Sequence, residues 1–284
     1  MKLCDLRVLK LRFVCRFRGS FLYSRASFPN LLRGCFGNAV FKSGNNAVRA
    51  LYEELFKPEI EDPLTDRYND VPKPFVLNPF LMRKKIYNPG DTFELGINLF
   101  GPFTQCPEII SQAFCEMGRL GFADGNAPFD VKEAFICHNP DKLIFNTGKR
   151  IGIDFISPLQ IRERGKYIRK PEFSSIFRRI YGRIRNLIYF YENEELEEDM
   201  SYVSNLLPEI RIFSCFMEKT ENSFRIPKEG VKQRFDGMEG RIVYEFPSEK
   251  DADMFLPWLS KGMSVHIGKN TSWGMGAYTF SVLN

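Results

Sequence analysis

The segment Glu172–Glu192, EFSSIFRRIYGRIRNLIYFYE, is the clearest secondary-structure signal in the chain. Its apolar residues recur every three or four positions, as they do on the buried face of an amphipathic helix. The segment before it, Arg150–Ile161, is rich in β-branched and aromatic residues and is typical of a buried strand. A strand followed by a long helix indicates that the second half of the chain is a layered α and β unit.

The remainder of the second half completes a repeating pattern. Two further strands, one more helix and a last strand follow in that order. We expect them at Ile210–Lys219, Gly240–Phe246, Asp251–Met263 and Gly276–Leu283. The resulting order, strand–helix–strand–strand–helix–strand, is that of a ferredoxin-like or RRM-like unit.

The first half of the chain shows the same order. Its expected strands are Leu6–Tyr23, Phe75–Asn78, Thr92–Phe100 and Asp130–Ile136, the last extended by Lys142–Phe145. Its expected helices are Leu31–Phe41, Ala47–Phe56 and Pro107–Gly121. The sequence therefore predicts an α+β protein of two tandem ferredoxin-like (βαββαβ) domains, residues 1–147 and 148–284, with a C-terminal glycine-rich loop.

The charge distribution favours a polyanionic partner. The 284-residue chain has a net charge of +5, yet one acidic run between residues 192 and 199 contributes six negative charges. The rest therefore carries +11, which favours nucleic-acid binding. Seven scattered cysteines without metal-ligand spacing predict a reducing cytoplasm, and basic residues interrupt the apolar N-terminus. We expect no metal, no small-molecule cofactor and no membrane partner.

The glycine-rich stretch His266–Gly276, HIGKNTSWGMG, follows a predicted helix and precedes the last strand. That placement excludes a dinucleotide fingerprint, and the spacing excludes a Walker loop. Gly268, Gly274 and Gly276 allow close approach of the backbone to a phosphate, and Lys269 adds a positive charge. An ordinary glycine-rich turn is the alternative.

Basic residues gather in two other places. Arg178, Arg179 and Arg183 lie on the helix quoted above, and Arg225, Lys232 and Arg234 lie in an expected hairpin over residues 222–240. Together they predict a groove that follows a phosphate backbone, with a solvated charged face as the alternative. The only histidines are His138 and His266, and no metal-binding or triad motif accompanies them.

Five blocks in this order resemble the CRISPR pre-crRNA-processing endoribonucleases of the sixth Cas family, in the RAMP superfamily. They are LRGCFG (32–37), PKPFVL (72–77), GDTFELG (90–96), ISPLQI (156–161) and VHIGKNTSWGMGAY (265–278). The resemblance covers nearly the full length. It implies two ferredoxin-like domains and CRISPR repeat RNA as the partner. It further implies metal-independent cleavage, in which a 2′-OH attacks the adjacent phosphate and leaves a 2′,3′-cyclic phosphate and a 5′-OH.

The chain departs from the family pattern at one place. Many members carry a catalytic histidine just after the first helix, where this chain has FKSGNN (41–46). Lys42, Arg33 and Tyr23, with His266 as an outside candidate, are therefore the expected catalytic residues. The missing histidine keeps open a non-catalytic subunit that holds the crRNA in an effector complex with other Cas proteins. A general RRM-type protein is a third interpretation, but the aromatic strand signature of that module is not found.

Overall fold

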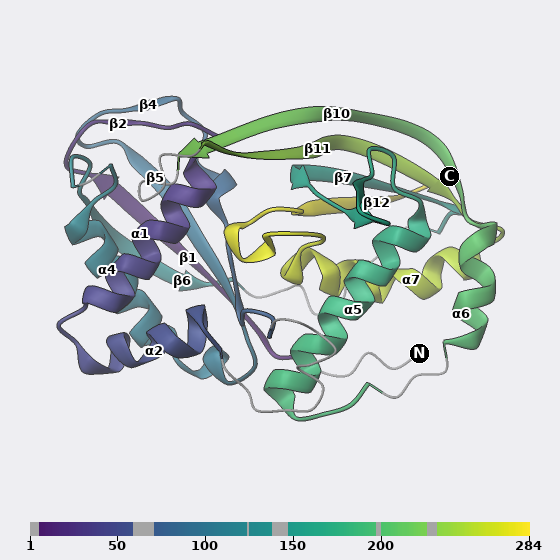
Figure 1. Cartoon of the computed structure of the whole chain (residues 1–284), viewed down its shortest axis with the longest axis horizontal. Coiled ribbons are helices and arrows are strands. Elements are labelled where there is room, and N and C mark those ends of the chain that lie inside the picture. The colour runs from purple at the N-terminus through teal and green to yellow at the C-terminus, as the bar shows by residue number, and fades with distance from the viewer. Residues whose placement is uncertain (1–5, 59–70, 124, 138–146, 197–199, 226–231) are drawn as a thin grey trace.

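The computed structural model describes residues 6–58, 71–123, 125–137, 147–196, 200–225 and 232–284, and the side chains of residues 221–236 are outside this description. Helices and antiparallel sheets alternate along it, so the predicted α+β class is confirmed. The first half of the chain forms a sheet with helices at one end of the molecule, and the second half forms another at the opposite end (Figure 1).

The first sheet has the strand order β3-β5-β1-β6. Its strands are β1 (Val8–Phe17), β3 (Phe75–Leu77), β5 (Thr92–Phe100) and β6 (Phe129–Ile136). The helices beside it are α1 (Phe28–Lys42), α2 (Asn46–Phe56) and α4 (Pro107–Leu120). The short elements are β2 (Phe21–Leu22), β4 (Ile86–Tyr87), η1 (Pro79–Leu81) and η2 (Gly101–Gln105).

The second sheet has the order β10-β11-β7-β12. Its strands are β7 (Arg150–Leu159), β10 (Arg211–Arg225), β11 (Lys232–Glu245) and β12 (Tyr278–Leu283). Its helices are α5 (Phe173–Glu192), α6 (Ser201–Leu206) and α7 (Glu249–Val265). The short elements are β8 (Arg162–Glu163), β9 (Lys166–Tyr167), η3 (Leu207–Glu209) and η4 (Thr271–Trp273).

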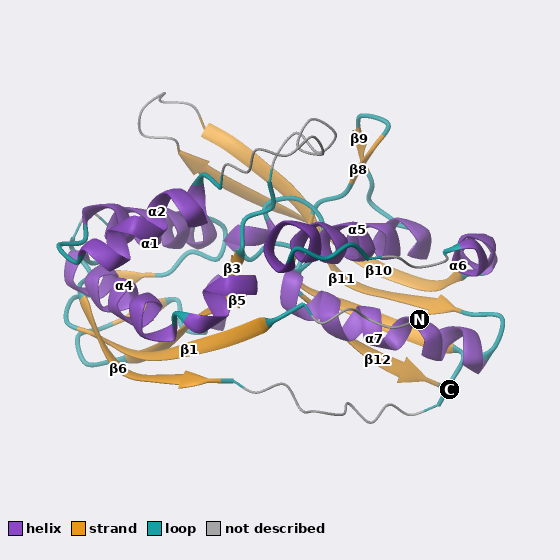
Figure 2. Cartoon of the chain, turned by 90° about the horizontal axis from the view of Figure 1, so that it is seen from below, coloured by secondary structure: helices purple, strands orange, loops and turns teal. Residues whose placement is uncertain are grey.

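The two sheets have the same topology. In each, the first strand along the chain lies between the fourth and the third, and the second strand lies outside the third. In Figure 2, β1 and β6 lie beneath α1, α2 and α4, and β12 lies beneath α7. The predicted pair of tandem ferredoxin-like units is thereby confirmed. The exact division at residue 148 stays a prediction, since residues 138–146 lie outside the described part.

The many aromatic residues are mostly core. The Phe17 ring stacks on Phe93 with centroids 4.1 Å apart, and Phe13 stacks on Phe114 at 4.0 Å. In the second unit, the buried Phe173 ring meets Phe246 and Phe255 edge-on, each at 4.9 Å. Large rings bury much apolar area each and so hold each helical layer on its sheet.

The strands β10 and β11 differ most from prediction. Strands were expected over Ile210–Lys219 and Gly240–Phe246, but the two form one long hairpin in which Arg225 pairs with Lys232. The pairing of β11 with β7 stops at Met238. Beyond it the hairpin, here called the arm (residues 220–225 and 232–237), is only two strands wide, and its sequence lacks the apolar alternation of a half-buried strand. The expected Lys142–Phe145 strand lies outside the described residues.

Polar contacts join the two units. The Asn98 side-chain amide on β5 donates to the Ser264 carbonyl at the end of α7, 2.8 Å away. The Tyr191 hydroxyl at the end of α5 donates to the Pro72 carbonyl at 2.7 Å. Arg7 forms an ion pair with Glu192 at 2.7 Å. The ends of α5 and α7 therefore face the first unit, and these contacts hold the two units together.

Candidate functional site

The glycine-rich stretch between α7 and β12 lies at the junction of the two units. Gly274 and Gly276 have φ of +90° and +69°, in the left-handed region that favours glycine. A Cβ at Gly274 would collide with Pro79 and lie 2.6 Å from the Leu77 carbonyl oxygen, both in the first unit. The stretch His266–Gly276, here called the wedge, is therefore packed between the two units rather than being an open loop.

The backbone amides of this wedge are largely used inside the protein. The Gly274 amide donates to the Thr271 carbonyl at 2.8 Å, and the Gly276 amide donates to the Pro158 carbonyl at 3.0 Å. These two N–H groups are thus not available to a phosphate, which corrects the predicted cradle at both glycines. Gly268, with φ of +88°, packs against the Gln160 carbonyl oxygen, where a Cβ would be 2.5 Å away. The Lys269 side chain is exposed and stays a predicted RNA contact.

His266 begins the wedge and is buried. The residue is only 3% exposed, and its Nδ1 has no hydrogen-bond partner among the described residues. Burial, with the Arg183 charge as a second cause, lowers the pKa of His266 to about 3. The imidazole is therefore neutral at physiological pH and out of reach of an RNA chain. Burial argues against the predicted catalytic role of His266, which stays a prediction.

Arg33 lies on α1 and faces the wedge from the other side. Its guanidinium carbon is 5.4 Å from the centre of the Trp273 ring and 5.6 Å from that of Phe56. Burial lowers the pKa of Arg33, and Nε is buried without a hydrogen-bond partner among the described residues. No carboxylate of the described part forms an ion pair with it. A desolvated cation between two rings, lacking an anion, can receive a phosphate oxygen.

Tyr23 lies at the N-terminal end of α1, with its ring edge-on to Phe28 at 5.2 Å. Its hydroxyl is buried and has no hydrogen-bond partner among the described residues. Burial raises the pKa of Tyr23 to about 12, with Arg25 opposing the shift and Glu239 adding to it. The phenol therefore stays protonated at neutral pH, and it can donate a hydrogen bond but cannot act as a base.

Lys42 is separated from the other two candidates. It is exposed at the last position of α1, fourteen residues after Phe28 and so about 21 Å along the helix axis. Nine residues separate it from Arg33, which is two and a half helical turns, so the two side chains leave opposite faces of α1. The structure therefore does not place Lys42 beside Arg33.

The arginines predicted on α5 separate into two groups. Arg178 and Arg179 are exposed and line a cleft of about 570 Å³ together with the β8–β9 hairpin. Arg183 instead turns inward, where Nε donates to the Val265 carbonyl at 2.6 Å. Burial lowers the pKa of Arg183 to about 10. Its Nε is used in joining α5 to the end of α7, and its RNA contact stays a prediction.

The predicted basic residues of the hairpin lie on the arm. Arg225 is paired with Lys232 across the two strands, and Arg234 with Ser223. The backbone thus brings three basic positions to one end of the arm. Their side chains lie outside the described residues, so their contact with RNA stays a prediction.

Comparison with known proteins assigns the family. A family model described as the CRISPR-associated endoribonuclease Cas6 matches residues 153–278, and a model described as an N-terminal domain matches residues 6–154. The chain therefore carries a Cas6 family domain over residues 153–278. A search of curated protein sequences found no match.

Solved Cas6 structures share the fold over nearly the whole chain. A Cas6 product complex is 15% identical, with a TM-score of 0.58 over 96% of this chain and 98% of its own. Cas6 of Thermus thermophilus is 11% identical, with a TM-score of 0.56 over 98% and 99%. A Cas6-related protein of Pyrococcus furiosus is 13% identical, with a TM-score of 0.51 over 96% and 98%. At these identities the likeness establishes the shared two-unit fold.

Two residues of this site were not predicted from the sequence. Arg25 donates to both carboxylate oxygens of Glu239 at 3.1 Å and to the Ile156 carbonyl at 2.6 Å, and so joins the two units beside Tyr23. Trp273 holds the Arg33 guanidinium. Since these contacts join residues more than one hundred positions apart, no local spacing could have indicated them. In the described residues, no helix is long and apolar enough to span a membrane, and no group of three metal-binding side chains occurs.

Proposed function

We propose that this protein binds CRISPR repeat RNA and cleaves the precursor transcript into guide RNAs. The observation that carries the proposal is Arg33, a partly buried cation held between Trp273 of the wedge and Phe56. Such a cation lacks a protein anion among the described residues and lies where the two units meet. A phosphodiester is the anion that a family of endoribonucleases would bring there.

The proposed reaction is metal-independent transesterification. The 2′-OH loses its proton to solvent as its oxygen forms a bond to the adjacent phosphorus, the bond from phosphorus to the 5′-oxygen breaks, and that oxygen takes up a proton. The products are a 2′,3′-cyclic phosphate and a 5′-OH. Arg33 stabilises the extra negative charge on the phosphoryl oxygens. Tyr23, which keeps its proton, positions the 2′-OH by a hydrogen bond or gives a proton to the leaving oxygen.

Alignment and charge supply most of the proposed rate enhancement. The described histidine, His266, is buried and neutral, so it supplies no base. Holding the 2′-OH in line with the leaving oxygen lowers the barrier without one. The exposed Arg178, Arg179 and Lys269, and the basic end of the arm, would hold the rest of the RNA and retain the product.

The test is cleavage of a precursor RNA that carries the repeat of the protein's own CRISPR array. Purified protein is incubated with it in excess EDTA, and the ends of the products are analysed for a cyclic phosphate. A second substrate carries a single 2′-deoxynucleotide before the scissile phosphate. Binding of both RNAs with cleavage of the first alone is the expected result, whereas cleavage of the deoxy substrate or dependence on a metal would contradict the mechanism.

A non-catalytic crRNA-binding subunit of an effector complex is the second candidate. The observation in its favour is that Lys42 leaves α1 on the face opposite Arg33, with no described histidine beside either. Tight binding of the repeat with the RNA left intact would support this function, and other Cas proteins would then be its partners.

A further inference from the structure

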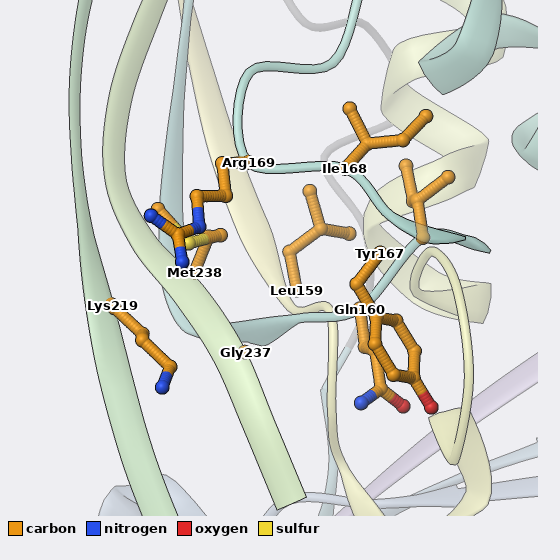
Figure 3. A pocket seen from close by; sticks show the side chains of 9 residues that line it. Leu159, Gln160, Tyr167, Ile168, Arg169, Lys219, Gly237 and Met238 are labelled. Carbon is orange, nitrogen blue, oxygen red and sulfur yellow. The ribbon is translucent and has the colours of Figure 1, made fainter. Parts of the chain in front are cut away.

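A pocket of about 210 Å³ lies where β11 leaves β7 and continues as the arm (Figure 3). Leu159 and Met238, which face each other across the last pair of β7 and β11, form its apolar wall. Tyr167 of the β8–β9 hairpin is 54% exposed beside it, and Arg169 and Lys219 add two positive charges. The volume is below the roughly 300 Å³ at which pockets for drug-sized ligands begin, so a single flat ring system suits it.

The charge of this pocket distinguishes it from the other hollows of the molecule. The described residues that line it include two basic side chains and no acidic one. The larger cleft beside α5 mixes its arginines with Glu163 and Glu172, and a third hollow mixes Lys84 with Glu94. Of these three hollows, only the pocket at the base of the arm combines an apolar wall, an exposed aromatic ring and basic side chains with no acidic one among its described lining residues.

The pocket also offers a hydrogen-bonding edge. Gln160 is 7% exposed, and Figure 3 shows its side-chain amide lying next to the Tyr167 ring. An amide presents a donor and an acceptor together, as the edge of a nucleobase requires. Tyr167 supplies a ring for stacking, which adds affinity for any base because every base has a π-face.

The pocket shares a wall with the wedge. The Gln160 carbonyl accepts the Lys269 amide at 3.1 Å, and Gly268 packs on the same carbonyl. A few residues further along the wedge, Trp273 meets Arg33. One rigid segment thus links this pocket to the candidate cleavage site, so an RNA held at both would be held in a fixed register.

We propose that this pocket captures one unpaired nucleotide of the bound RNA. Its base stacks on Tyr167 beside the Gln160 amide, and its phosphates lie near Arg169 and Lys219. The proposal rests on the proposed function in so far as the RNA is the CRISPR repeat. It adds a specificity site outside the place where the RNA is cut.

The test combines protein variants with RNAs that lack one base. Each unpaired position of the repeat is replaced in turn by an abasic nucleotide, and dissociation constants are measured for the wild type and for Tyr167→Ala. Stacking of one base predicts that Tyr167→Ala weakens binding of the intact repeat about tenfold. One abasic RNA should lose a similar factor with the wild type, and Tyr167→Ala should lose nothing more with that RNA.

Controls separate the ring from its surroundings. Tyr167→Phe keeps the ring and should bind as the wild type does. Tyr202→Ala removes a tyrosine of similar exposure, 59%, on α6 outside this pocket, and should leave binding unchanged. Wild-type affinity in Tyr167→Ala, or a loss that persists undiminished with every abasic RNA, would overturn the proposal.

An unstructured RNA decamer separates this proposal from the proposed function. If the repeat is not preferred but the decamer binds and depends on Tyr167, the pocket stands and the assignment to repeat RNA fails. If Tyr167→Ala binds the decamer as the wild type does, the pocket proposal fails, whatever the repeat does.

Discussion

Two arginines flank the wedge, and they differ in what surrounds the charge. Arg183 on α5 meets the beginning of the wedge, where Nε donates to the Val265 carbonyl. Arg33 on α1 meets its middle, where the guanidinium lies between the rings of Trp273 and Phe56. Burial lowers the pKa of both. Nε of Arg183 has a carbonyl acceptor, although its Nη2 is buried without a partner, whereas Arg33 has no acceptor among the described residues.

This difference separates a structural cation from one that awaits a ligand. A buried cation with an acceptor stabilises the fold, and its removal leaves the acceptor unpaired. A desolvated cation without an acceptor lowers stability, and its retention is explained by a ligand that supplies the missing anion. Burial alone therefore does not identify a functional arginine, and the difference between Arg33 and Arg183 can be tested.

The largest expected effect is the loss of cleavage in Arg33→Ala. Removing one charge that stabilises a transition state costs about 100- to 1,000-fold in rate. The free energy of unfolding should change by no more than about 1 kcal/mol, the value of the lost cation–π contacts. Single-turnover cleavage of saturating repeat RNA, with a parallel urea titration, measures both quantities.

Lys42→Ala is the matched control for that variant. It removes one positive charge from the same helix, but on the opposite face, so its cleavage rate should stay within about threefold of the wild type. A large loss in Lys42→Ala with little loss in Arg33→Ala would place the cutting centre at the other end of α1.

The next effect tests whether the wedge is structural. Gly274→Ala places a Cβ against Pro79 and the Leu77 carbonyl in a left-handed conformation, so it should lower the free energy of unfolding by about 3 kcal/mol. Gly182→Ala is its control, because that glycine lies in α5 and a Cβ there meets nothing within 4 Å. It should raise stability by about 0.5–1 kcal/mol. Chemical denaturation of both variants decides whether tight packing at Gly274 is what requires glycine.

The sequence predicted the helices and strands correctly where buried residues recur at regular spacing. The α5 helix and the β5 strand were placed within a residue, because every turn or alternate position faces a core. The arm was expected as a hairpin over residues 222–240, but its strands were not placed, because strands that pair only with each other have no buried face to impose a period. The end of β1 at Phe17 was missed as well, since Gly19 packs on the Asn126 carbonyl and interrupts the expected long strand.

The site was less accessible to sequence reasoning. A glycine-rich stretch next to a lysine indicates a phosphate loop, but the same glycines are needed where backbone packs on backbone. On a helical projection Arg178 lies far from the apolar face of α5 and Arg183 borders it, but only the contact with Val265 shows that Arg183 turns inward. Roles that depend on contacts between distant segments were therefore not readable from spacing.

A smaller effect is expected from paired methionine substitutions. Arg183→Met leaves the Val265 carbonyl without its donor and should lower the free energy of unfolding by about 2 kcal/mol. Arg33→Met keeps the contacts with the two rings and removes a desolvated charge, so its stability should lie within about 1 kcal/mol of the wild type. Equal losses in the two variants would remove the distinction between these arginines.

The smallest effect concerns the pH dependence of stability beside Arg183. His266 has a pKa of about 3 in the folded protein, below its ordinary value of 6.5, because it is buried near Arg183. The unfolded chain takes up this proton first as the pH falls, so the contribution of His266 is fully present above pH 6.5 and is lost on acidification towards pH 3. The loss is at most about 1.4 kcal/mol per pH unit. His266→Asn cannot titrate and tolerates a positive φ, so its stability should fall less steeply than that of the wild type between pH 6 and 4, as followed by urea denaturation. Parallel curves for the two proteins would mean that the pKa of His266 is not lowered in the folded protein. The imidazole would then be accessible to solvent, and the description of this part of the wedge as buried would be wrong.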